Sequence, residues 1–227
     1  MTAEERGTGQ DPEPERTQLG DGFAEGIELR AYPPLEIPEG SPKVLFLGDS
    51  ITAGLHLPPD HAWPAALQRS LFADGIPFHL QNAGVSGDTT AGGLGRMDWL
   101  LKGSPDFVVI ELGSNDGLRG IDLANTESNL HAIIKKAQDA GAQPILMGMD
   151  VPTNLAEYAE AFSAIYPRLA EVFDIPLVPS FFDGVGGHPD MNLKDGLHPT
   201  PEGHDVLAEN AKAVLKQALV GDGTEDQ

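Results

Sequence analysis

The stretch Lys43-Val44-Leu45-Phe46-Leu47-Gly48-Asp49-Ser50-Ile51-Thr52 decides the fold. Its apolar run, 44–47, ends at a Gly-Asp-Ser turn, which is typical of a short strand buried on both faces. Further strand candidates lie at 78–81, 107–112, 144–149 and 177–179, and helix candidates at 62–72, 90–101, 127–140, 155–173 and 201–219. This alternation predicts an α/β fold, a three-layer α/β/α domain with a five-stranded, parallel, doubly wound (flavodoxin-like) sheet.

The two ends of the chain differ in composition from this region. The first forty residues contain ten acidic and three basic side chains, and residues 27–42 contain four prolines. We therefore interpret 1–42 as an acidic, largely disordered N-terminal arm with an extended lead-in, 43–220 as the folded domain and 221–227 as a flexible acidic tail. The first twenty residues lack a basic region followed by an apolar one, so we expect a cytoplasmic protein. A periplasmic or secreted location is the alternative if an N-terminal signal has been removed.

The charge balance restricts the partners. The chain has 35 acidic and 14 basic side chains, a formal net charge of −21, and no cysteine. Binding to nucleic acid depends on a basic surface, so we expect no nucleic-acid partner. No apolar run approaches the roughly 18 residues that a membrane span requires, so we expect no integral membrane association.

Three chemically promising segments follow the first three predicted strands. They contain Ser50 after the first strand, Gly84 in the turn 82–89 after the second, and Asn115 in the turn 113–117 after the third. Sites in parallel sheets lie beyond the carboxyl ends of the strands, so these segments are expected at one edge. Taken singly, each residue is also a common choice for a helix cap or a turn.

A fourth segment, Asp195-Gly196-Leu197-His198-Pro199, precedes the last predicted helix. An aspartate three residues before a histidine can turn back and accept a hydrogen bond from the imidazole. Such a pair holds one tautomer and stabilises the imidazolium that forms when the histidine takes a serine proton. For this segment alone, a surface loop with an incidental histidine is an equally good interpretation.

Together the four segments resemble the GDSL, or SGNH, hydrolase family, whose blocks carry a characteristic Ser, Gly, Asn and His. Ser50, Gly84, Asn115 and His198 match these blocks in order, and Asp195 lies at the expected place before the histidine. The resemblance spans nearly all of 43–219. It is greatest for the bacterial branch described as acyl-CoA thioesterase I, protease I, lysophospholipase and arylesterase, particularly at 82–90, 111–120 and 161–167.

This resemblance implies a serine esterase that cleaves small-molecule acyl esters or thioesters through an acyl-serine intermediate. It implies Ser50 as nucleophile, His198 as general base and Asp195 as the residue that orients His198. The oxyanion hole would consist of the Ser50 and Gly84 backbone N–H groups and the Asn115 side chain. The mechanism needs neither metal nor cofactor.

Other residues near these blocks have weaker indications. Leu118, Met149 and Leu197 are candidates for contact with an acyl chain, although core packing is the simpler role for each. Asp49 is interpreted as a turn residue that bonds the backbone. The remaining histidines are interpreted as structural or exposed: His56, His61, His79, His131, His188 and His204. Only His56 and His61 have a spacing typical of zinc ligands, and the prolines between them argue against a metal site there.

Two alternatives stay open at this point. One is a carbohydrate O-acetylesterase, because the same family includes deacetylases with the same four blocks. The other is a non-catalytic, flavodoxin-like module that binds a small molecule with its strand-end loops. The complete set of nucleophile, base and oxyanion donors favours an enzyme.

Overall fold

The computed structural model describes residues 16–17, 29–151 and 156–221. Residues 1–15 and 18–28 of the N-terminal arm predicted over 1–42, and residues 222–227 of the predicted tail, lie outside these residues. Within the described part, β1 (Arg16–Thr17) pairs antiparallel with β2 (Leu29–Arg30). Residues 31–42 then lead to the main sheet without regular structure apart from a turn at 39–40.

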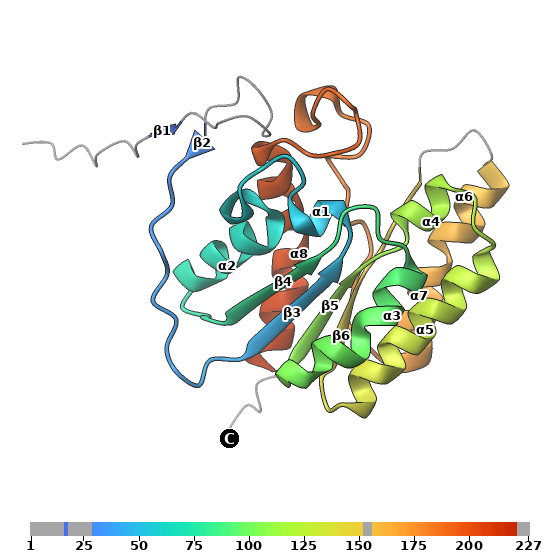
Figure 1. Cartoon of the computed structure of the whole chain (residues 1–227), viewed down its shortest axis with the longest axis horizontal. Helices are drawn as coiled ribbons and strands as arrows, with labels where there is room; N and C mark the ends of the chain where they lie inside the picture. The colour runs from blue at the N-terminus through green and yellow to red at the C-terminus, as the bar shows by residue number, and fades with distance from the viewer. Residues whose placement is uncertain (1–15, 18–28, 152–155, 222–227) are drawn as a thin grey trace, which may run out of the picture.

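The main sheet has five parallel strands in the order β4-β3-β5-β6-β7. They are β3 (Lys43–Gly48), β4 (His79–Gly84), β5 (Phe107–Glu111), β6 (Gln143–Met147) and β7 (Leu177–Val178). The predicted fold class is confirmed. Because the chain passes from β3 to β4 on one side and returns to β5 on the other, the switch point lies between β3 and β5 (Figure 1). Ligands of open parallel sheets bind at such a point.

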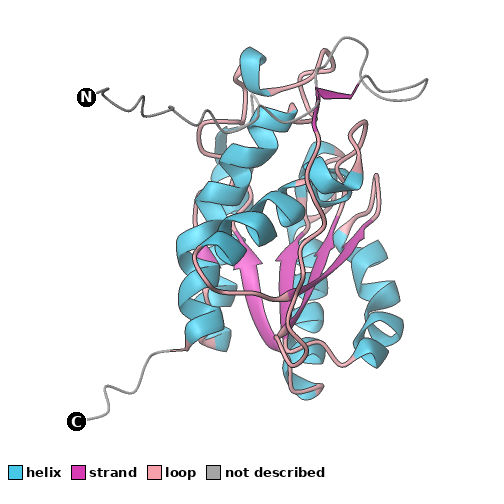
Figure 2. Cartoon of the chain, turned by 90° about the vertical axis from the view of Figure 1, so that its left-hand side faces the viewer, coloured by secondary structure: helices cyan, strands magenta, loops and turns pink. Residues whose placement is uncertain are grey.

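Helices cover both faces of this sheet (Figure 2). On one face α2 (Trp63–Ala73) packs against α8 (Pro201–Val220), and on the other lie α3 (Thr90–Leu100), α5 (Leu123–Asp139) and α7 (Ile165–Phe173). The predicted start of α8 is confirmed, since Thr200 Oγ1 accepts a hydrogen bond from the Gly203 N–H and Pro201 is the first helical residue. Shorter helices are α1 (Ser50–Ala53), α4 (Ser114–Leu118), α6 (Ala156–Ser163), η1 (Pro59–His61), η2 (Leu101–Gly103) and η3 (Pro189–Met191).

Two predicted helices differ from those observed. The single helix expected over 155–173 is divided into α6 and α7 at Ala164. Pro167 explains the division, because its ring nitrogen cannot donate to the carbonyl of Ser163 four residues earlier. The helix expected to begin at 127 begins at Leu123, where the Asp122 carboxylate caps it by accepting from the Ala124 N–H. Sequence periodicity alone missed this cap.

The core beneath α2 and α8 is aromatic. Phe46 on β3 and Trp63 on α2 are fully buried, with ring centroids 5.1 Å apart in an edge-to-face arrangement. His204 on α8 is also buried, and its Nδ1 accepts a hydrogen bond from the Trp63 N–H at 3.1 Å. Burial lowers the pKa of His204 to about 3, so its ring is neutral at physiological pH.

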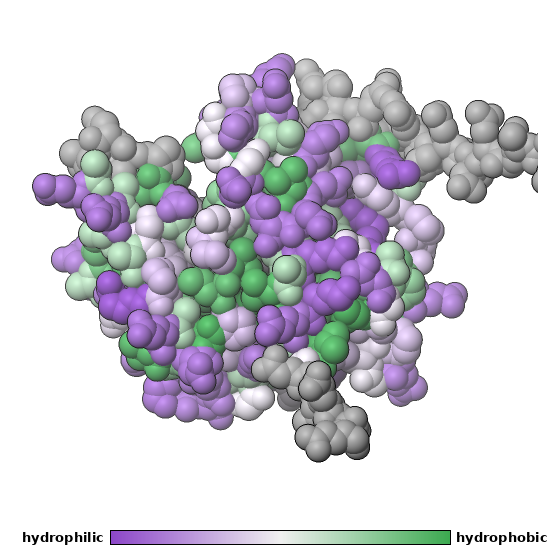
Figure 3. Space-filling model, turned by 180° about the vertical axis from the view of Figure 1, so that it is seen from behind, coloured by the Kyte–Doolittle hydropathy of each residue, from purple (hydrophilic) through white to green (hydrophobic). Residues whose placement is uncertain are grey.

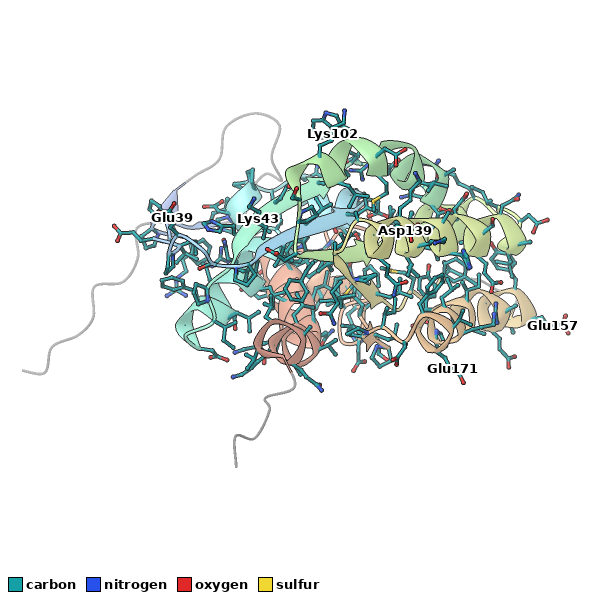
Figure 4. All side chains as sticks on the ribbon, turned by 90° about the horizontal axis from the view of Figure 1, so that it is seen from below. Glu39, Lys43, Lys102, Asp139, Glu157 and Glu171 are labelled. Atoms are coloured by element: carbon teal, nitrogen blue, oxygen red, sulfur yellow. The ribbon has the colours of Figure 1, made fainter. Side chains whose placement is uncertain are left out.

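Charged side chains lie mainly at the outside of the molecule. Figure 4 views the molecule from below, and there the Glu157 and Glu171 side chains point away from the sheet. Lys43 lies at the start of β3 in the same view. The back of the molecule is a mosaic of hydrophilic and hydrophobic side chains (Figure 3). In the part of the chain that the structure describes, no helix has the length and apolar character to cross a membrane.

We predict opposite effects for alanine at two helical glycines, Gly203 in α8 and Gly95 in α3. A Cβ at Gly203 would lie 2.3 Å from the Met191 carbonyl oxygen, whereas one at Gly95 would meet nothing within 4 Å. Gly203→Ala should lower the free energy of unfolding by about 1–3 kcal/mol, because the added methyl group overpacks against the loop before α8. Gly95→Ala should stabilise by about 0.5–1 kcal/mol. Urea unfolding measures both, and equal effects of the two substitutions would contradict this account.

Candidate active site

The turn after β3 places Ser50 at the carboxyl edge of the sheet. Ser50 is the first residue of α1, and Asp49 caps this helix by accepting a hydrogen bond from the Ile51 N–H at 2.9 Å. The backbone-bonding role predicted for Asp49 is therefore confirmed. The Ser50 N–H has no hydrogen-bond partner among the described residues, so it remains available to a ligand.

The loop before α8 brings His198 to Ser50. His198 Nε2 lies 3.0 Å from Ser50 Oγ, and His198 Nδ1 lies 2.6 Å from Asp195 Oδ2. With Nδ1–H donating to Asp195, the Nε2 lone pair faces the Ser50 hydroxyl. Two bonds steady the loop: the Leu193 N–H donates to the His198 carbonyl, and the Thr200 N–H donates to the Met191 carbonyl.

Asp195 is held as an anion. Partial burial opposes its ionisation, but hydrogen bonds from the His198 backbone N–H, the His198 imidazole and the Leu197 N–H lower the pKa of Asp195 to about 2. The carboxylate is therefore charged at every pH at which the fold is expected to function.

Asn115 reaches the same point from α4, after β5. Its Nδ2 donates to Asp49 Oδ2 at 2.9 Å, and its Oδ1 accepts from Arg119 Nη2 at 3.4 Å. Since an amide nitrogen carries two hydrogens, one of them remains for a ligand. Asp49 thus both caps α1 and orients the Asn115 amide.

Gly84 at the end of β4 and Gly87 in the turn that follows differ in the hydrogen bonding of their N–H groups. The Gly84 N–H donates to Asn82 Oδ1 at 2.9 Å, so the donor expected from the sequence is already engaged. The Gly87 N–H has no hydrogen-bond partner in the described part of the chain. Gly87 has a φ of +79°, and its carbonyl accepts from Arg119 Nη2, the same nitrogen that contacts Asn115. Sequence reasoning missed Gly87 because its signal, a left-handed backbone, is visible only in the folded chain.

A single guanidinium joins three segments around the site. Arg96 on α3 donates through Nη2 to the Gly48 carbonyl at 3.0 Å and through Nη1 to the Ala83 carbonyl at 2.5 Å. Its Nε donates to Asp88 Oδ2 at 2.8 Å. The rigid fork of arginine therefore fixes the ends of β3 and β4 and the loop after β4 relative to one another.

Two carboxyl groups are buried beneath the nucleophile turn. Glu111, at the end of β5, is fully buried, and its Oε2 accepts from Thr52 Oγ1 at 2.6 Å. Burial, with the neighbouring Asp49 charge as second cause, raises the pKa of Glu111 well above its ordinary value. Burial also raises the pKa of Asp49 to about 6, against the opposing hydrogen bonds from Ile51 and Asn115. Glu111 was not predicted as a site residue, because nothing in the local sequence distinguishes it from an ordinary residue at the end of a strand.

The three predicted acyl-contact residues have different environments. Leu118 and Leu197 are each 51% exposed, whereas Met149 is buried and accepts a weak hydrogen bond from Ser114 Oγ. Met149 lines a pocket of about 290 Å³ together with Tyr166, but no residue of the Ser50–His198–Asp195 set lines it. Val85, in the turn after β4, is 47% exposed and was not anticipated. Three exposed apolar side chains thus occur in the segments that carry Gly87, Asn115 and His198: Val85 in the turn after β4, Leu118 in α4 and Leu197 in the loop before α8.

Known proteins are similar to this chain in sequence and in fold. Residues 46–206 match the GDSL-like Lipase/Acylhydrolase family. Esterase TesA of Pseudomonas aeruginosa is 43% identical over 178 residues, 78% of this chain and 89% of that protein. Thioesterase 1/protease 1/lysophospholipase L1 of Escherichia coli K12 is 42% identical over 168 residues, 73% of this chain and 79% of that protein.

Solved structures lead to the same family. The crystal structure of TesA superposes with a TM-score of 0.75 at 43% identity, covering 78% of this chain and 99% of that chain. The resemblance drawn from the four sequence segments is thereby confirmed. The chain belongs to the GDSL-like lipase/acylhydrolase family and is a carboxylic ester hydrolase.

Proposed function

We propose that Ser50, His198 and Asp195 form the catalytic triad of this ester hydrolase. The observation that carries the proposal is the continuous chain of contacts, 3.0 Å from Ser50 Oγ to His198 Nε2 and 2.6 Å from His198 Nδ1 to Asp195 Oδ2. These distances are those of a nucleophile and its general base. The low pKa of Asp195 matches the role of balancing the imidazolium charge.

In the acylation step Ser50 Oγ attacks the carbonyl carbon while His198 Nε2 takes the hydroxyl proton. Collapse of the tetrahedral intermediate breaks the bond to the leaving oxygen or sulfur, which receives that proton from His198. Water then attacks the acyl-serine by the same route. The acid is released and Ser50 regains its proton.

The oxyanion of each tetrahedral intermediate would be held by N–H donors at the edge of the sheet. Among the described residues, the Ser50 N–H and the second Asn115 Nδ2 hydrogen have no acceptor; Asp49 precedes Ser50 in the chain and accepts the first Asn115 Nδ2 hydrogen. As third donor the sequence favoured Gly84, but its N–H would first have to leave Asn82. Gly87 is the better candidate, because its N–H is unpaired within the described residues and Arg119 links its carbonyl to Asn115. Each such donor contributes about 10²–10³ in rate.

For the substrate we propose a neutral or weakly charged ester or thioester with an apolar acyl chain, including aryl esters and the lysophospholipid-type esters that the name of the Escherichia coli relative suggests. Val85, Leu118 and Leu197 would contact the acyl chain at the site entrance. The net charge of −21 disfavours strongly anionic substrates and nucleic acid through long-range repulsion. Acyl-CoA should therefore be cleaved more slowly than an uncharged ester of equal chain length.

A carbohydrate O-acetylesterase remains the second candidate, since an acetyl group would need no apolar contact beyond the triad. The three exposed apolar side chains favour longer acyl groups. Chain-length preference separates the two candidates.

We predict the following kinetic behaviour for p-nitrophenyl esters from acetyl to palmitoyl, measured beside one acyl-CoA. Activity should be greatest at medium or long chains. Ser50→Ala should abolish turnover, and Asn115→Ala should lower kcat by about 10²-fold or more with a smaller effect on KM. Activity restricted to acetyl would favour the O-acetylesterase. Wild-type rates in the Ser50→Ala protein would refute the triad.

A second prediction concerns Asp49, which we propose positions Asn115. The pKa of Asp49 is raised from an ordinary 3.8 to about 6. Between these two pKa values the folded chain keeps the Asp49 proton that the unfolded chain releases. The free energy of unfolding therefore falls as the pH rises from the lower value through the higher one. Relative to Asp49→Asn, the wild type should lose stability between about pH 4 and about pH 6.5. The variant should also have a lower kcat, because the Asn115 amide loses its charged acceptor.

Urea unfolding at both pH values and steady-state kinetics measure the two effects. An Asp49→Asn protein with unchanged kcat would show that Asp49 does not position Asn115. A stability difference independent of pH would contradict the raised pKa.

A third prediction concerns Arg96, which we propose positions the loops of the site. Arg96→Lys keeps the charge but cannot reach the Gly48 carbonyl, the Ala83 carbonyl and Asp88 together. We expect kcat to fall by about tenfold to a hundredfold, because small displacements of reacting groups cost rate steeply. Arg168→Lys is the matched control, since Arg168 bonds the Glu127 carboxylate and the Ala164 carbonyl at the surface and should behave as wild type. Equal kcat values in the two folded variants would exclude the role of Arg96.

A further inference from the structure

His56 is a histidine that neither the triad nor the oxyanion hole uses. It follows α1 in a tight turn, in which the Leu55 N–H donates to the Ser50 carbonyl and the Leu57 N–H donates to the Gly54 carbonyl. His56 has a φ of +72°, a left-handed conformation that is uncommon for residues other than glycine. Such conformations persist only where the surrounding structure imposes them, so the position of His56 relative to Ser50 is well defined.

This turn places the His56 ring against His198. The two ring centroids are 5.6 Å apart and the ring planes meet at 87°. The side-chain ligand atoms of His56, Asp195 and His198 all lie within 4.8 Å of one another. His56 and Asp195 are exposed and His198 is half-buried, so an ion can reach the group from solvent.

Two imidazoles and one carboxylate form a ligand set suited to zinc. Zinc sites with three protein ligands of this kind keep a fourth position for water, at ligand distances of about 2.0–2.2 Å. The three donor atoms lie within 4.8 Å of one another, and rotation of the exposed His56 and Asp195 side chains would bring them to the roughly 3.4 Å separation that a tetrahedral ion at such distances requires. Magnesium and calcium, by contrast, require mostly oxygen ligands in larger number.

We propose that His56, Asp195 and His198 form a binding site for Zn²⁺ that inhibits the esterase reversibly. Inhibition follows from the fact that His198 has only two ring nitrogens, and both are used in the triad. An ion on Nε2 takes the lone pair that accepts the Ser50 proton. An ion on Nδ1 displaces its proton to solvent and takes the place of the Asp195 hydrogen bond. The inhibitory effect rests on the proposed role of His198, whereas binding itself does not.

The test compares wild type, His56→Asn and His188→Asn in hydrolysis of p-nitrophenyl butyrate with increasing ZnCl₂ in a non-chelating buffer. Asparagine tolerates the left-handed backbone at position 56 and removes the imidazole. His188 is an exposed histidine outside the group and provides the matched control. We expect wild type and His188→Asn to be inhibited equally, with activity restored by EDTA. For His56→Asn the half-inhibitory concentration of Zn²⁺ should rise by at least about tenfold. Even a residue that only supports a metal ligand contributes about that much to metal affinity, and His56 is proposed as a ligand.

A second measurement separates binding from catalysis. Calorimetric titration of Zn²⁺ into the Ser50→Ala protein should show one binding site, and adding His56→Asn should weaken it by a similar factor. Binding that depends on His56 without any zinc inhibition would refute the role of His198 as base and leave the metal site standing. Equal zinc affinity with and without His56, or equal inhibition by MgCl₂, would overturn the metal site.

Discussion

The position of Ser50 depends on the close packing of backbone at the carboxyl end of β3. A Cβ at Gly48 would lie 2.1 Å from Thr52 Oγ1 and 2.6 Å from Glu111 Oε2. On the neighbouring strand, a Cβ at Gly84 would lie 2.2 Å from the Ala53 nitrogen. These glycines face each other in the register of β3 and β4, so that α1 can begin directly at the sheet edge. Larger residues at either position would displace the helix that carries the nucleophile.

The same packing places acidic groups where water cannot solvate them. Asp49 and Glu111 are both buried, and the Arg96 guanidinium at the same sheet edge is committed to two carbonyls and Asp88. Burial of uncompensated carboxyl groups costs stability at neutral pH, as their raised pKa values indicate. In the proposed mechanism the buried Asp49 carboxylate has a catalytic purpose. Its two oxygens cap α1 and orient the Asn115 amide at the same time, which only a carboxylate at position 49 can do.

The general arrangement of the site was predictable because strand order in a parallel sheet has a simple consequence. Whatever the detailed packing, the segments following β3, β4 and β5 must emerge at one edge, and the order of the chain puts the switch point there. Local chemistry was also readable where it depends on neighbours in sequence, as in the Thr200–Pro201 start of α8. The prediction failed where a single residue overrides the helical periodicity. Pro167 divides the helix expected over 155–173, and Asp122 caps α5 so that it begins earlier than the periodicity suggests.

The sequence by itself determined the fold class, the family and the segments that meet at the sheet edge, because periodicity, turn residues and motif order are local properties of the chain. The tertiary structure decided which donors in these segments are free. It showed the Gly84 N–H bonded to Asn82 and the Gly87 N–H without a partner among the described residues, and it brought Arg96 and Glu111 beneath a turn that is distant in sequence. It also placed His56 against His198. Saturation of hydrogen bonds and proximity between distant residues depend on how the elements pack, and no local pattern encodes that packing.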